Sequence, residues 1–216
     1  MSLFVQHETP LLKWGIWQLT ESWEQLADRL PHHRQQAEQF GTPHRRQEWL
    51  AVRALIASLC GKEETVAYHP NGKPYLVDNS HSISISHTRG YAAVIMGKPD
   101  KEVGIDIEQY GERVHRVAHK FMRTDESVQA TVQTEQTDTY SLLLHWSAKE
   151  TMFKCLHTTD VDFREHLRIF PFVMNDKGSM QAQEYRTPEQ QLFTIEYELH
   201  TDFVLTYTLS AHLLSR

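Results

Sequence analysis

Apolar and polar residues alternate with a period of two along several short segments of the chain, which is typical of half-buried β-strands. The clearest example is V-G-I-D-I-E at residues 103–108, where three apolar residues alternate with Gly104, Asp106 and Glu108. Because alternate residues of a strand share a face, we expect both carboxylates on one side, about 7 Å apart. The same alternation predicts strands at residues 13–19, 83–86, 91–96, 193–199 and 203–209.

Helical periodicity marks three longer segments, in which apolar residues recur every three or four positions. These predicted helices are residues 45–60, 112–122 and 140–156. Asn71-Gly72 predicts the turn of a β-hairpin. Residues 124–139 are polar, with few large apolar side chains, so we expect much of this stretch to be an exposed excursion. The alternation of both kinds of element indicates a mixed α/β protein.

The last predicted helix contains W-S-A-K-E-T-M-F-K at residues 146–154. Trp146, Glu150 and Lys154 are spaced to share one helix face, with Lys149 beside it. If this face meets the acidic face of residues 103–108, three carboxylates and two lysines come together. Oxygen ligands without thiolates favour Mg²⁺ or Mn²⁺ over zinc, and lysines beside such a cation indicate a phosphate-bearing substrate.

A purely structural explanation competes with the metal site at this stage. Glu150 and Lys154 form a common surface ion pair when they stand alone, worth about 0.3–0.5 kcal/mol. Asp106 and Glu108 are, in the same view, the solvated face of an edge strand. The two fragments occur in one chain, and this favours the metal site.

Four motifs, in their order along the chain, resemble the 4′-phosphopantetheinyl transferases of the larger, Sfp-like branch. Asp106 and Lys149 lie 43 residues apart, which suits the family pattern. Each short motif alone is weak, whereas four in sequence with sensible gaps are specific. The motifs are R-R-x-E-W-L-A-V-R at 45–53, G-K-P at 72–74, S-I-S-H-T at 84–88, and the pair formed by 103–108 and 146–154.

The resemblance implies a fold of two similar α/β halves related by a pseudo-twofold. It divides the chain into residues 1–100, on the side of the coenzyme A adenylate and 3′-phosphate, and residues 101–216, with the metal and the catalytic helix. Coenzyme A is expected in the cleft between the halves. One chain with two halves can complete such a cleft, so we expect a monomer.

The resemblance also implies an activity of the holo-acyl-carrier-protein synthase type. Phosphopantetheine passes from coenzyme A to a serine of an apo acyl or peptidyl carrier protein, and 3′,5′-ADP is released. Mg²⁺, or Mn²⁺, is expected on Asp106, Glu108 and Glu150. Glu150 is expected to deprotonate the serine, directly or through a metal-bound water, while Lys149 and Lys154 act on the phosphates. The expected coenzyme A contacts are Arg45, Arg46, Arg53, Lys73, Ser86, His87, Lys149 and Lys154.

Several of these residues also have ordinary explanations. The arginines of 45–53 form a basic solvent face if they do not clamp the 3′-phosphate, and Lys73 is a surface lysine on a turn. His87 is either a structural residue at a strand end or a ligand for a phosphate oxygen. The carrier is expected to dock at Lys120, Phe121, Met122 and Arg123, unless Phe121 belongs to the core and Arg123 to solvent.

Composition narrows the remaining classes. The chain has 216 residues, of which 40% are hydrophobic and 23% charged, as in ordinary soluble proteins. The net charge of −6 argues against general nucleic-acid binding. No apolar run reaches membrane-spanning length, and the start lacks a secretory pattern. Only Cys60 and Cys155 are available for disulfides, which favours a reducing cytoplasm.

Two further enzyme or binding functions stay open on the sequence. One is a Mg²⁺-dependent phosphate-ester hydrolase that uses the same carboxylates. The other is a non-catalytic protein that binds coenzyme A or a carrier. A zinc site is disfavoured, because His115 and His119 have suitable helical spacing but no third ligand with recognisable spacing.

Overall fold

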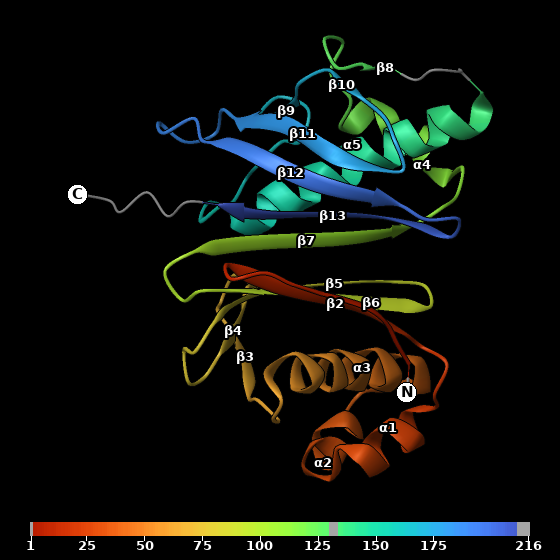
Figure 1. The fold of residues 1–216 in the computed structure, drawn as a ribbon, viewed down its shortest axis with the longest axis vertical. Helices are drawn as coiled ribbons and strands as arrows, with labels where there is room; N and C mark the ends of the chain where they lie inside the picture. Colours follow the sequence, from red (N-terminus) through yellow and green to blue (C-terminus); the bar gives the residue numbers. More distant parts are fainter. Residues whose placement is uncertain (1, 130–133, 211–216) are drawn as a thin grey trace. The chain divides into compact units, whose positions relative to one another are not determined.

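The chain forms two compact units, Met1–Asp100 (unit 1) and Lys101–Arg216 (unit 2), in a computed structural model that describes residues 2–129 and 134–210 (Figure 1). Each unit combines an antiparallel sheet with a long helix. The mixed α/β fold predicted from the sequence is therefore confirmed. The pseudo-twofold and the roles assigned to the two halves stay predictions.

Unit 1 is built on a four-stranded sheet in the order β1-β2-β6-β5, in which neighbouring strands run antiparallel. The long helix α3 packs against β2 and β6. It begins after Thr42, whose side chain accepts the N–H of Arg45, and it ends at Gly61, whose φ of 75° favours glycine. The elements are β1 Leu3–Glu8, β2 Leu12–Gln18, α1 Trp23–Arg29, η1 Pro31–His33, α2 Arg34–Ala37, α3 Pro43–Cys60, β3 Val66–Tyr68, β4 Pro74–Leu76, β5 Ser82–Thr88 and β6 Tyr91–Gly97.

Unit 2 is built on a five-stranded sheet in the order β7-β13-β12-β11-β9, crossed on one face by the long helix α5 (Figure 1). The short strands β8 and β10 form a separate parallel pair. The core of this unit lies between α5 and the sheet and includes Leu144, Met152 and Ile195. The elements are β7 Glu102–Gln109, α4 Arg113–Val117, η2 Ala118–Lys120, β8 Val128–Gln129, α5 Glu135–Cys155, β9 Leu167–Ile169, β10 Phe172–Val173, β11 Lys177–Glu184, β12 Leu192–Leu199 and β13 Phe203–Ser210.

Gly104 sets the close approach of β7 and α5. A Cβ atom at this position would lie 2.3 Å from the main-chain oxygen of Thr151 and 2.9 Å from Sγ of Cys155. α5 is also hydrogen-bonded to β13, the strand that pairs with β7. The hydroxyls of Ser147 and Thr151 lie 2.9 and 2.7 Å from the hydroxyl of Thr206 on β13. The absence of a side chain at Gly104 thus lets the helix face reach the next residues of β7.

Two predicted helices differ from the observed ones. α5 begins at Glu135 and not at 140, because Thr134 and Thr137 form a reciprocal cap with both side chains and backbone N–H groups. Part of the stretch 124–139 is thus helical, and residues 130–133 lie outside the described part. The helix predicted at 112–122 is only α4 followed by the 3-10 turn η2, where the carbonyl of Ala118 accepts the N–H groups of both Phe121 and Met122.

None of the helices in the described ranges has the length and apolar character needed to cross a membrane.

Candidate functional site

The acidic face of β7 meets the predicted face of α5. Nζ of Lys154 lies 2.8 Å from Oδ1 of Asp106, and it also donates to the main-chain oxygen of Ile105 at 2.8 Å. About two helical turns earlier, Nε1 of Trp146 donates to Oε1 of Glu108 at 2.7 Å. The structure therefore brings the two sequence fragments together, with each carboxylate of the strand bonded to one residue of the helix.

Glu150 lies between these two contacts on the same helix face, and it belongs electrostatically to the same cluster. Burial raises the pKa of its carboxyl group, and the charge of Asp106 raises it further, against the opposing effect of Lys154. A carboxylate with a raised pKa is a stronger base than a solvated one. This environment suits a group that removes a proton from a hydroxyl.

The carboxyl group of Glu108 is more strongly affected. Burial and the neighbouring charge of Asp106 raise its pKa from 4.5 to about 7, with a smaller contribution from Glu150. The hydrogen bond from Trp146 and the charge of Lys154 act in the opposite direction. Three carboxylates thus share a partly buried space with one ammonium group, so the cluster carries excess negative charge.

The chemistry of this cluster fits a hard divalent cation. Three carboxylates supply the oxygen ligands that Mg²⁺ prefers, and a cation would relieve the repulsion that raises the pKa values of Glu108 and Glu150. As the structure stands, no group of three His, Cys, Asp or Glu side chains within residues 2–129 and 134–210 is placed to hold a metal ion. The oxygen of Asp106 is bonded to Lys154, so a cation would have to compete with this ammonium.

Lys149 lies apart from this carboxylate cluster. Its side chain has no exposed surface, and Nζ is 2.8 Å from Oε1 of the equally unexposed Glu126. The predicted contact of Lys149 with phosphate has no support in this placement, because a phosphate group would have to enter a closed interior. The sequence analysis missed Glu126, which lies in the polar stretch 124–139 and carries no local signal of burial.

Unit 1 brings together two of its predicted coenzyme A residues. Nη1 of Arg45, on α3, donates to Nε2 of His87, on β5, at 3.2 Å. Glu48 joins them, 3.2 Å from Arg45 and 3.5 Å from Nδ1 of His87. Since Arg45 requires an acceptor, the ring hydrogen of a neutral His87 is on Nδ1, facing Glu48. Arg45 and His87 are both exposed, as expected of residues that meet a ligand.

Three further predicted coenzyme A contacts of unit 1 are less exposed than Arg45 and His87. Arg46 is half-buried and donates to the main-chain oxygens of Phe40 and Glu38. Lys73 is half-buried, and its backbone N–H is bonded to Asn71 within the turn. Ser86 is buried on β5.

Arg53 corrects the expectation of a basic solvent face. Its side chain is only 4% exposed, and its guanidinium lies 3.9 Å from the ring centroid of Trp49. It donates to the main-chain oxygen of Trp49 and to the hydroxyl of Tyr68, both at 3.4 Å. The aromatic ring and these two acceptors explain how a charged residue is accommodated on the core side of α3. Little of the guanidinium surface is left for a phosphate group.

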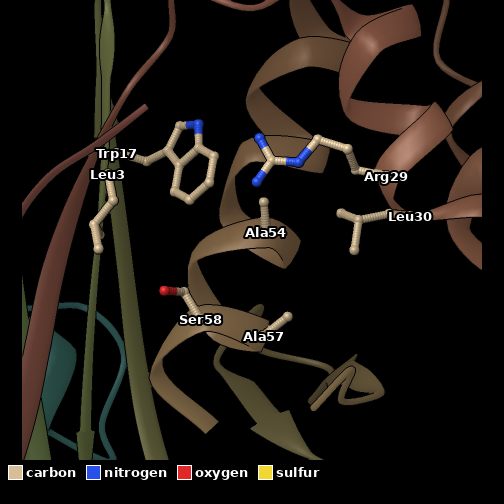
Figure 2. A pocket seen from close by; sticks show the side chains of 7 residues that line it. All are labelled: Leu3, Trp17, Arg29, Leu30, Ala54, Ala57 and Ser58. Carbon is tan, nitrogen blue, oxygen red and sulfur yellow. The ribbon is translucent and has the colours of Figure 1, made fainter. Parts of the chain in front are cut away.

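A hollow of about 240 Å³ lies in unit 1 between the sheet and helices α1 and α3. Figure 2 shows its walls, with the Arg29 guanidinium pointing toward Trp17 and Ser58 at the side nearer Leu3. Arg29 is paired with Glu21. None of the residues that line the hollow belongs to the four motifs, so it is not part of the candidate site. The lining residues are Leu3, Trp17, Arg29, Leu30, Ala54, Ala57 and Ser58.

The four residues expected to receive the carrier are also divided by the structure. Phe121 is fully buried in the core, and Met122 is half-buried. Arg123 is bonded to Asp125 and to the main-chain oxygens of Arg164 and Glu165. Lys120 is exposed. The explanation of Phe121 as a core residue is thus the correct one.

The comparison with protein families gives a match over the part of the chain that contains the β7 and α5 motifs. Residues 102–208 match the 4′-phosphopantetheinyl transferase superfamily, and this range includes β7, α5 and most of β13. No curated protein matches the chain. The assignment to the Sfp-like branch stays a prediction. From the superfamily match, together with the joined β7 and α5 motifs, residues 102–208 belong to the 4′-phosphopantetheinyl transferase superfamily.

Proposed function

We propose that this protein transfers the 4′-phosphopantetheine group of coenzyme A to a serine of an apo acyl or peptidyl carrier protein. The observation that carries the proposal is the union of β7 and α5, where Asp106 and Glu108 meet the face of Lys154 and Glu150. This union lies within the residues that match the superfamily. The proposed cofactor is Mg²⁺, with Mn²⁺ as a substitute, on Asp106, Glu108 and Glu150.

The proposed reaction forms one P–O bond and breaks another. The serine oxygen attacks the β-phosphorus of coenzyme A, and the bond from this phosphorus to the bridging oxygen breaks, so that 3′,5′-ADP leaves. Glu150 takes the serine proton, which suits its raised pKa. Lys154 stabilises the charge that grows on the departing phosphate and supplies it with a proton. Mg²⁺ held by Asp106, Glu108 and Glu150 would neutralise charge on the pyrophosphate.

Coenzyme A contacts in unit 1 are proposed for Arg45 and His87, which are exposed and joined to each other. Arginine suits the 3′-phosphate because its guanidinium offers paired donors to phosphate oxygens. Lys73 and Ser86 remain proposed contacts on the family pattern alone. The chain is proposed to act as a monomer in the cytoplasm, where its two free cysteines, Cys60 and Cys155, would stay reduced.

Intact-protein mass spectrometry tests the function directly. An apo carrier protein is incubated with this protein, coenzyme A and Mg²⁺, and a parallel sample contains a chelator. We expect the carrier to gain one phosphopantetheine group on its serine in the first sample only. Release of free phosphopantetheine without a modified carrier would identify a hydrolase. Tight binding of coenzyme A with no gain on several carriers would identify a binding protein.

A further inference from the structure

The buried ammonium group of Lys149 is saturated by protein acceptors. It lies 2.8 and 3.0 Å from the two carboxylate oxygens of Glu126. It also donates to the main-chain oxygens of Phe121 at 2.6 Å and of Phe163 at 3.1 Å. A lysine has three hydrogens to donate, and these three residues account for all of them. No hydrogen is left over for a ligand.

Glu126 is held as firmly as its partner. Its Oε2 accepts the backbone N–H of Arg123 and its Oε1 accepts that of Ile169, both at 2.8 Å. The pair therefore ties α5 to the segment before β8, to the segment after α5 and to β9. Burying two charges costs free energy of desolvation, and only a well-bonded pair offsets this cost. The pair of Lys149 and Glu126 meets this condition, since every donor and acceptor is used.

The two carbonyl groups bonded to Lys149 belong to Phe121 and Phe163, whose rings both contact Trp146. The ring centroid of Phe121 lies 5.3 Å from that of Trp146, and the ring centroid of Phe163 lies 5.4 Å from it. Trp146 in turn donates its indole hydrogen to Glu108 at 2.7 Å. A continuous set of contacts thus leads from the buried ion pair to one of the three carboxylates.

We propose that Lys149 and Glu126 are a positioning pair. They fix the two phenylalanines that pack against Trp146, and the indole of Trp146 then orients the carboxylate of Glu108. Neither member of the pair touches substrate, so this role replaces the expected contact of Lys149 with phosphate. The catalytic consequence rests on the proposed function, whereas the link from the pair to Trp146 does not.

The link to Trp146 is tested by nuclear magnetic resonance on protein with ¹⁵N-labelled indoles. The test protein is the double variant Lys149→Met/Glu126→Gln, which removes both charges and leaves no lone buried charge. The Trp146→Phe variant identifies the indole signal of Trp146 by its loss. We expect this signal to shift in the double variant and its hydrogen to exchange at least about 10-fold faster. An unchanged signal and exchange rate would overturn the proposal.

The control is a second ion pair in the same unit, Lys177 and Glu198, which lie 3.0 Å apart on β11 and β12. The double variant Lys177→Met/Glu198→Gln makes the same change in charge and is expected to leave the Trp146 signal in place. Should Lys149→Met/Glu126→Gln lose its native near-ultraviolet circular dichroism, Lys149→Gln/Glu126→Gln replaces it. This variant also leaves no lone buried charge and keeps hydrogen-bonding side chains at both positions, and the same outcomes apply.

Coenzyme A binding and transfer kinetics then separate positioning from phosphate contact. For a positioning pair, kcat falls about 10–100-fold in Lys149→Met/Glu126→Gln, while the Kd of coenzyme A stays within about 2-fold. Adding Trp146→Phe to this variant should lower kcat little further, because both changes interrupt the same series of contacts between Lys149 and Glu108. If the Kd of coenzyme A rises 10-fold or more and the Trp146 signal does not move, Lys149 contacts phosphate and the positioning role is wrong. If the wild-type protein transfers nothing, the proposed function fails, and the indole signal still decides the link.

Discussion

Lys154 holds Asp106 through a 2.8 Å contact between Nζ and Oδ1, and this contact joins the end of α5 to the middle of β7. The same ammonium group donates to the main-chain oxygen of the preceding residue, Ile105. Asp106 is almost fully buried, whereas 23% of the Lys154 side chain is exposed. Lys154 therefore supplies a positive charge to the carboxylate cluster while it remains accessible to a ligand.

The Asp106→Asn variant tests the carboxylate without a change in shape. We expect transfer to fall by more than about 100-fold, because the loss should exceed that caused by residues behind a metal ligand. The free energy of unfolding should stay within about 1 kcal/mol of wild type, because the hydrogen bond from Lys154 is kept as a neutral one. The amide can still accept from Lys154. The substitution also removes the charge of Asp106, which adds to the effect of burial in raising the pKa values of Glu108 and Glu150. Both quantities are measured on the same preparation.

Asp138→Asn provides the matched control for this substitution. Asp138 is an exposed acid in the first turn of α5, so its replacement makes the same chemical change at a distance along the helix. Its transfer rate should equal that of wild type. An Asp106→Asn protein that retains full activity would exclude Asp106 from the metal site.

The raised pKa of Glu108 makes stability depend on pH. Its carboxyl group has a pKa of about 7 in the folded protein, against an ordinary value of 4.5. A group whose pKa is raised by folding contributes stability that is present below its unfolded pKa and is lost as pH rises through the folded pKa. In chelator, Glu108→Gln should therefore be more stable than wild type at pH 8, by about 1–3 kcal/mol. The two proteins should agree near pH 4.5.

Urea denaturation at a series of pH values measures this difference. The control is Glu189→Gln, since Glu189 is an exposed acid in the loop before β12. Its profile should follow that of wild type throughout. If Glu108→Gln also follows the wild-type profile between pH 5 and 8, the carboxyl group of Glu108 is not neutral in the folded protein.

The sequence predicted the strand and the helix at the centre of the site, because residues 103–108 alternate with a period of two and residues 146–154 have helical spacing. β7 extends one residue beyond each end of the predicted segment, and α5 contains the whole of residues 146–154. Local patterns also predicted where β12 and β13 lie. The reason is that one face of each of these strands is apolar, and apolar and polar residues alternate over enough positions to be recognised.

The parts that the sequence did not predict depend on contacts between distant residues. β11 was missed because its inward positions are filled by residues such as Met180 and Ala182 among glutamines, which make a weak alternation. The burial of Lys149 depends on Glu126, 23 positions earlier. Arg53 is buried through Trp49 and Tyr68. A charged residue in a sequence gives no sign of such a partner, so exposure was the natural expectation.

Gly104→Ala tests the close approach of β7 and α5. The added methyl group would meet the main-chain oxygen of Thr151 at 2.3 Å and Sγ of Cys155 at 2.9 Å, so the helix has to move. We expect a loss of about 1–3 kcal/mol in the free energy of unfolding, as for other overpacked sites. Transfer should fall as well, because Glu150 and Lys154 move with the helix.

Gly111→Ala is the control for the backbone effect of replacing glycine. Nothing lies within 4 Å of a Cβ atom at Gly111, so its stability in urea should be close to that of wild type. Equal stability of the two alanine variants would contradict the steric role of Gly104.

Arg45 and Arg53 lie on one helix but should respond differently to replacement. Arg45 is half exposed and bonded to His87, so Arg45→Gln should raise the Kd of coenzyme A about 10-fold with little change in stability. Arg53→Gln should lower the free energy of unfolding by about 1–2 kcal/mol, because a buried contact with Trp49 is lost. Its coenzyme A Kd should be unchanged. Calorimetric titration and urea denaturation measure the two effects. Weaker coenzyme A binding in a stable Arg53→Gln protein would restore Arg53 as a ligand.

Lys120 is the exposed basic residue among the four expected to receive the carrier. If an acidic carrier docks here, Lys120→Glu should raise the KM for the carrier several-fold and leave the Kd of coenzyme A unchanged. The effect should shrink between about 0.05 and 0.5 M salt, because screening weakens contacts between exposed charges. Lys98→Glu, an exposed lysine after β6, makes the same change in net charge and should leave the KM near the wild-type value. Equal effects of the two variants would show that net charge, and not a docking contact at Lys120, governs the encounter with the carrier.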